Sequence, residues 1–104
     1  MRIARIRISQ KTLSDVPEDR VFWLNDGRVL RNIRDLSSAL ADMGPGVFQH
    51  HVNCERNDFV NWIRDVVCDK TLVKAINGIG TPEQLRTKLD NRISRLESLS
   101  QKRR

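Results

Sequence analysis

The chain has 104 residues and a formal net charge of +6, and 38% of its residues are hydrophobic while 31% are charged. This length predicts a single domain, since a typical domain holds about 100–200 residues. The apolar runs stay well short of the roughly 18 residues of a membrane-spanning helix. The apolar content is also too high and too regularly spaced for a disordered chain, so both classes are excluded.

The positive charge is concentrated at the two ends of the sequence. Residues 1–12 hold 4 basic residues and no acidic one, residues 13–80 hold 8 basic and 10 acidic residues, and residues 81–104 hold 7 basic and 3 acidic residues. Basic ends on a nearly neutral body are one pattern of nucleic-acid-binding proteins. The alternative is that the ends fold back against the acidic middle.

The first third of the sequence predicts β-structure. Apolar and charged residues alternate from Ile3 to Ile8, which indicates a short strand with one buried face. A second apolar run at 21–24 leads into Asp26-Gly27, a hairpin signal because both central residues of a type I′ turn need positive φ. We expect a small hairpin in which Trp23 is half buried, with the N-terminal strand beside it. The alternative is a single strand and a loop.

From residue 32 onward the apolar spacing becomes helical, and about five helices are expected. They cover residues 32–43, 47–52, 57–67, 69–76 and 81–100, and the third has the fullest apolar face. A polar residue that can cap the first turn precedes four of them. These expected caps are Asn32, Asn57, Asp69 and Thr81.

Together these segments predict a mainly α fold of about five helices with a small N-terminal β element, in one compact domain over residues 1–104. Within it, residues 1–12 form a basic N-terminal strand or arm, residues 20–100 a helical body, and residues 101–104 a basic tail.

The most distinctive string of the sequence combines His51-Val52-Asn53, Asn57-Asp58-Phe59 and Trp62-Ile63-Arg64-Asp65, with Asp26-Gly27-Arg28 before it. In this string the chain resembles a small family of domains of unknown function from archaea and bacteria, over about three quarters of its length. Members of that family usually carry glycine where this chain has Cys68. The resemblance implies a fold, and it implies no activity, cofactor or catalytic residue.

Four side chains are of types that bind metal ions: His50, His51, Cys54 and Cys68. Structural zinc sites usually pair their ligands as Cys-x(2–4)-Cys or His-x(3–5)-His, and these four residues do not. We therefore expect no metal, no cofactor and two free thiols. Since the N-terminus also lacks the apolar stretch of an export signal, we expect a cytoplasmic protein.

His51, Asn57 and Asp58 form the most chemically suggestive cluster. A histidine oriented by a carboxylate can act as a general base, but no nucleophile motif or glycine-rich phosphate loop accompanies it. The simpler interpretation is that Asn57 or Asp58 caps the following helix and His51 packs beside it, hydrogen-bonded, with Phe59 and Trp62 in the core. We expect no catalytic residue, and an enzyme centred on His51 is the least favoured alternative.

The last helix carries the main indication of function. Its basic residues other than Arg86 follow one flank of the apolar stripe with no acidic residue among them, which is slightly unfavourable unless an anion lies against them. We expect a small non-enzymatic binding module that contacts nucleic acid or a ribonucleoprotein through its basic ends, in a salt-sensitive and sequence-blind manner. The candidate residues are Arg2, Arg5, Arg7, Lys88, Arg92, Arg95, Lys102, Arg103 and Arg104.

Two other interpretations of the charge remain open. The basic row can be a solvated helix face with no partner. Alternatively, the chain is a protein-interaction or scaffold module, or a subunit that self-associates through its last helix or through the edge of the strand at Ile3–Ile8. None of these interpretations involves a membrane.

Overall fold

The structure is a computed structural model that describes residues 10–101, with the side chains of residues 10–100. Residues 10–13 form a helical turn, and Ile63–Val67 form a π-helical turn that directly continues α4. The named elements are η1 (Glu18–Arg20), β1 (Phe22–Trp23), β2 (Val29–Leu30), α2 (Ile33–Leu40), α3 (Pro45–His51), α4 (Asp58–Trp62), η2 (Ile63–Val67), α5 (Lys70–Ile76) and α6 (Pro82–Gln101).

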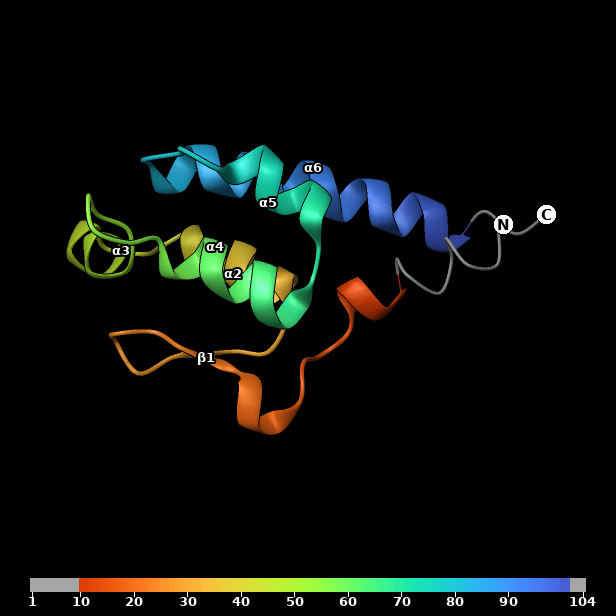
Figure 1. The fold of residues 1–104 in the computed structure, drawn as a ribbon, viewed down its shortest axis with the longest axis horizontal. Helices are drawn as coiled ribbons and strands as arrows, with labels where there is room; N and C mark the ends of the chain where they lie inside the picture. Colours follow the sequence, from red (N-terminus) through yellow and green to blue (C-terminus); the bar gives the residue numbers. More distant parts are fainter. Residues whose placement is uncertain (1–9, 102–104) are drawn as a thin grey trace.

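The elements are arranged in layers (Figure 1). The long helix α6 lies beside α5 on one side of the molecule, α2 and α4 lie beneath them, and the β1–β2 hairpin lies on the opposite side of α2 and α4. The core fills the space between the helices. Its largest fully buried side chains are Phe59, Ile33, Leu36, Ile63, Leu72, Ile76, Leu89 and Leu96. The mainly helical single domain with a small β element is thus confirmed.

The predicted hairpin is present, but its turn differs from the expected type I′. Strands β1 and β2 pair antiparallel, and the Gly27 N–H donates to the Leu24 carbonyl at 2.9 Å. Gly27 has φ 94°, whereas Asp26 has no positive φ, since Cys68 is the only non-glycine residue with one in the described chain. The loop is therefore a three-residue turn with glycine in the left-handed position, which needs only one such residue. The strand expected at Ile3–Ile8 lies outside the described residues.

The helix predicted over 57–67 is interrupted after its first turns. The Cys68 N–H donates to the Ile63 carbonyl, five residues back, at 2.7 Å, which is the spacing of a π turn. Phe59, Trp62, Ile63 and Val67 are nevertheless all buried. The π turn changes the hydrogen bonding while keeping the apolar face on the core.

Cys68 ends this segment in the left-handed conformation, with φ 64° and ψ 41°. A side chain in this region costs about 1–2 kcal/mol, which glycine avoids. Because glycine also gains entropy in the unfolded chain, we expect Cys68→Gly to raise the free energy of unfolding by a net of about 0.5–1 kcal/mol. Urea denaturation measures this. The control, Cys68→Ala, removes the exposed thiol but keeps the Cβ. Equal free energies of unfolding for the Gly and Ala variants would contradict the claim that a Cβ at position 68 strains the backbone.

Candidate functional site

His51 stands at the end of α3 and uses both of its ring nitrogens within the protein. Its Nε2 accepts the backbone N–H of Asn25 at 3.0 Å, and its Nδ1 lies 3.0 Å from Oδ2 of Asp58. A backbone amide can only donate, so Nε2 carries no proton in this arrangement and the proton of the neutral ring is on Nδ1, which donates to Asp58. The ring is buried, with 5% of the residue exposed.

The surroundings of His51 tie three segments of the chain together. Phe22 of the hairpin and Phe59 of α4 pack against the imidazole at centroid distances of 5.0 and 5.4 Å. Asp58 also binds Nε of Arg56 at 3.2 Å, and Asn57 caps α4 by accepting the Val60 N–H at 3.1 Å. The predicted cap and the hydrogen-bonded histidine beside it are therefore both present. Because the acceptor nitrogen of His51 is occupied by Asn25, the arrangement is that of a structural bridge.

A second tether holds the hairpin loop on its other side. Oδ1 of Asp26 accepts the Arg28 N–H at 3.0 Å, and the Arg28 guanidinium reaches Oδ2 of Asp26 at 2.9 Å and Oδ1 of Asp42 at 2.8 Å. Asp42 follows α2, so this interaction joins the loop to that helix. The hydrogen-bonded Arg28 side chain lowers the pKa of Asp26, and the Asp26 carboxylate raises the pKa of Arg28.

The lowered pKa of Asp26 leads to a testable pH dependence. A carboxyl whose pKa is lower in the folded than in the unfolded chain stabilises the fold above its ordinary pKa, and this stabilisation is lost as the pH falls through the folded pKa. We expect Arg28→Gln to raise the pKa of Asp26 toward its ordinary value and so to weaken this acid-side dependence, while the backbone N–H of residue 28 still donates to Asp26. Carboxyl ¹³C NMR titration measures the pKa. The control is Arg64→Gln, which releases Asp65, whose pKa is lowered by its hydrogen bond to Arg64, and leaves Asp26 unchanged.

Arg92, predicted as part of the basic row, is bound inside the protein. Its Nε and Nη2 lie 2.7 and 3.0 Å from the two carboxylate oxygens of Asp69. The side chains of Arg92 and Asp69 are only 19% and 4% exposed. Oδ1 of Asp69 also accepts the Leu72 N–H at 3.2 Å and so caps α5. Arg92 thus joins α6 to α5, and its charge is already matched by a carboxylate.

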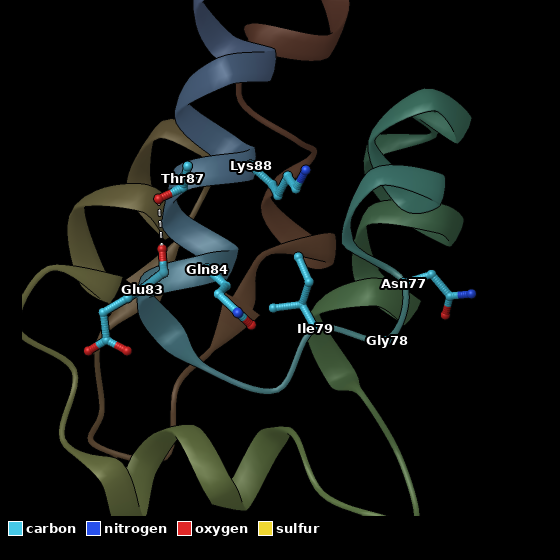
Figure 2. Close-up of a pocket in the computed structure, with 7 residues that line it drawn as sticks. All are labelled: Asn77, Gly78, Ile79, Glu83, Gln84, Thr87 and Lys88. Carbon is cyan, nitrogen blue, oxygen red and sulfur yellow. Dashed lines mark hydrogen bonds between the residues drawn. The ribbon is translucent and has the colours of Figure 1, made fainter.

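Lys88 and Arg95, the other described members of the row, are exposed, and neither has a carboxylate within ion-pair distance among residues 10–100. Lys88 and Gln84 extend from α6 on the side of Ile79 and line a hollow of about 410 Å³ beside the loop after α5 (Figure 2). The remaining candidates lie outside the described residues: Arg2, Arg5, Arg7, Lys102, Arg103 and Arg104. The charge of Arg92 is therefore paired within the protein, whereas the charges of Lys88 and Arg95 are, within the described part of the chain, free to bind a ligand.

The metal-capable residues are dispersed. Cys54 and Cys68 are exposed free thiols, and the described part of the chain contains no group of three or more His, Cys, Asp or Glu side chains that could hold a metal ion. Across residues 10–101, no helix has the length and apolar character needed to span a bilayer.

Trp23 is a feature that the sequence interpretation missed. It is 66% exposed rather than half buried, and it is the only large hydrophobic residue exposed on the described surface. Successive side chains of a strand point to opposite faces, so Phe22 and Trp23 lie on opposite faces of the hairpin. Residues 21–24 are all apolar, so the sequence does not show which of the two faces is buried. The other tryptophan, Trp62, is buried as predicted and donates its Nε1–H to the Arg20 carbonyl at 2.9 Å.

Comparisons with protein-family models, curated proteins and solved structures give no match to this chain. The family suggested by the string from His51 to Asp65 therefore stays a prediction, and a function has to be argued from the charges and contacts of the residues themselves.

Proposed function

We propose that this protein is a small non-enzymatic binding module that contacts the phosphate backbone of nucleic acid, free or within a ribonucleoprotein, through its basic ends. The observation that carries the proposal is the placement of those ends. Residues 10–13 and the end of α6 lie toward the same end of the long axis of the molecule (Figure 1). The basic segments that precede and follow the described residues are therefore attached toward the same end of the molecule, and the exposed Arg95 lies in the last two turns of α6.

The ion pairs of α5 and α6 leave an excess of positive charge on these helices. Their acidic residues Asp69, Asp90 and Glu97 are engaged by Arg92, Arg86 and Arg34 respectively. Among the described residues of these helices, Glu83 is the one acidic side chain that forms no ion pair. By comparison, four exposed cationic side chains in the same described part of these helices form no ion pair. These four cations are Lys70, Lys74, Lys88 and Arg95. Cations not matched by carboxylates are the groups that bind phosphate and release its counterions.

The expected binding is salt-dependent and largely independent of sequence. Lysine and arginine that contact phosphates position a protein on nucleic acid without reading bases. The logarithm of the binding constant for duplex DNA should fall with the logarithm of salt concentration with a slope of about −0.9 for each phosphate bound. We expect Lys88→Gln/Arg95→Gln to make this slope shallower by about 0.9 for each phosphate that the variant no longer binds.

Fluorescence anisotropy with a labelled random-sequence duplex, titrated at two salt concentrations, measures the slope. The matched control is Arg28→Gln/Arg64→Gln, which removes the same formal charge from two arginines that are already paired with carboxylates away from α6. We expect its slope to match that of the wild type. Absence of binding at low salt rules the proposal out, and equal slopes for the two double variants remove Lys88 and Arg95 from the binding surface.

A further inference from the structure

One side of α6 is exposed and carries only polar and basic side chains in the described part of the helix. Helical spacing places seven exposed polar or basic residues within an arc of about 120°, while the acidic residues of α6 lie outside this arc. We call this arc the α6 polar face: Gln84, Thr87, Lys88, Asn91, Ser94, Arg95 and Ser98. It combines two cations with amide and hydroxyl groups, the side chains that make most hydrogen bonds to DNA.

We infer that the α6 polar face docks along the major groove of duplex DNA, an inference that rests on the proposed function and names its substrate class. Charge complementarity selects a polyanion, since neither Lys88 nor Arg95 has a carboxylate partner among residues 10–100. The two residues are seven positions apart, about 10 Å along the axis, so they contact separate phosphates. Asn91 and Ser94 between them face the base edges.

The shape of α6 also fits this occupant. The helix has 20 residues, which corresponds to a length of about 30 Å and a diameter of about 10–12 Å with side chains. The major groove of B-DNA is about 12 Å wide and admits an α-helix, whereas the major groove of an RNA duplex is too narrow. Ser94, Arg95 and Ser98 are exposed. In this half of α6, α2 contacts the helix through the Arg34–Glu97 ion pair, and helical spacing places Glu97 outside the arc of the exposed polar residues.

Single strands are the less suitable ligand. Proteins that bind them stack bases on exposed aromatic rings, and the α6 polar face has none. The exposed ring of the described surface, Trp23, lies on the hairpin, on the other side of α2 and α4 from α6 (Figure 1). Bases held against α6 therefore have no exposed aromatic ring of the described surface beside them.

The test compares three probes of one random 20-nucleotide sequence: duplex DNA, duplex RNA and single-stranded DNA. We expect duplex DNA to bind the full chain at least tenfold more tightly than either other probe, and to show protection of guanine N7, which lies in the major groove. Asn91→Glu puts a carboxylate in the centre of the α6 polar face and should weaken binding to duplex DNA by about tenfold or more. The matched control is Asn61→Glu at an exposed position of α4, which should change affinity less than twofold.

The outcomes separate this inference from the proposed function. Equal affinity for the two duplexes, a preference for single strands, protection confined to the minor groove, or equal effects of Asn91→Glu and Asn61→Glu would each overturn docking of α6 in the major groove while leaving phosphate binding intact. Absence of salt-dependent binding to all three probes would overturn both. Circular dichroism of each variant verifies that a loss of binding does not reflect loss of the fold.

Discussion

Replacing Asp69 by alanine is expected to lower the free energy of unfolding by about 3–5 kcal/mol, the range for breaking one partner of a buried ion pair. The Asp69 side chain is 4% exposed and binds two nitrogens of Arg92 at 2.7 and 3.0 Å. Its removal leaves the Arg92 guanidinium, itself only 19% exposed, without its carboxylate. The same carboxylate caps α5, and loss of a cap costs about 1 kcal/mol. Urea denaturation measures the change.

Three further variants separate the cap from the ion pair. Asp69→Asn keeps a good capping residue but loses the charge, so its loss should be smaller than that of Asp69→Ala. Arg92→Lys keeps the charge but loses the bidentate hydrogen bonding to Asp69, so its free energy of unfolding should fall. The slope of its DNA-binding constant against salt concentration should equal that of the wild type. The double variant Asp69→Asn/Arg92→Met, which leaves no buried charge, should recover much of the loss. A cost for Asp69→Ala below about 1 kcal/mol would mean that solvent screens the pair.

Arg92 illustrates the limit of a helical projection made from sequence. The spacing of apolar residues correctly places Leu85, Leu89 and Leu96 in the core and puts Arg92 at the border of the apolar stripe. The width of the buried stripe depends on which helix lies alongside, and that is a tertiary property. Since α5 covers this flank, Arg92 became an internal partner of Asp69, whereas Arg95, one turn further along, stayed exposed.

The helix caps could be predicted because they depend on short-range chemistry. Asn32, Asn57 and Asp69 each accept the backbone N–H three residues later, and Thr81 does the same for Gln84. Each such bond is made within one turn, so sequence spacing is sufficient to anticipate it. The π turn at Ile63–Val67 is different. It alters which carbonyl each N–H reaches but keeps the apolar residues on one side, so the apolar pattern carries no sign of it.

The hairpin loop was predicted only in part because Asp-Gly is compatible with more than one turn. Gly27 supplies the left-handed residue, and this suits a three-residue loop as well as a two-residue one. The tertiary hydrogen bonds that accompany the three-residue loop join Asn25 to His51 and Arg28 to Asp42. The partners are separated by 26 and 14 positions, beyond the reach of any local pattern. For the same reason the exposure of Trp23 depended on what the opposite hairpin face packs against.

Replacing His51 by alanine is the second change with a large expected effect, a loss of about 2–4 kcal/mol in the free energy of unfolding. Removing a ring that is 5% exposed leaves a cavity beside Phe22 and Phe59. It also leaves the Asn25 N–H and the Asp58 carboxylate without the partners that they have at 3.0 Å. The control is His50→Ala at the exposed neighbouring position, where we expect a change within about 0.5 kcal/mol.

Two amide substitutions divide the bridge into its two hydrogen bonds. The side-chain amide of asparagine lies near the position of Nδ1, so His51→Asn keeps a donor for Asp58 and loses the bond to Asn25. Glutamine reaches the position of Nε2, so His51→Gln keeps an acceptor for the Asn25 N–H and loses the donor to Asp58. Amide hydrogen exchange at Asn25 should therefore stay slow in wild type and His51→Gln and become fast in His51→Asn and His51→Ala. If exchange is equally slow in all four, the hairpin loop is held by the Arg28 tether alone, and His51 serves as packing beneath it.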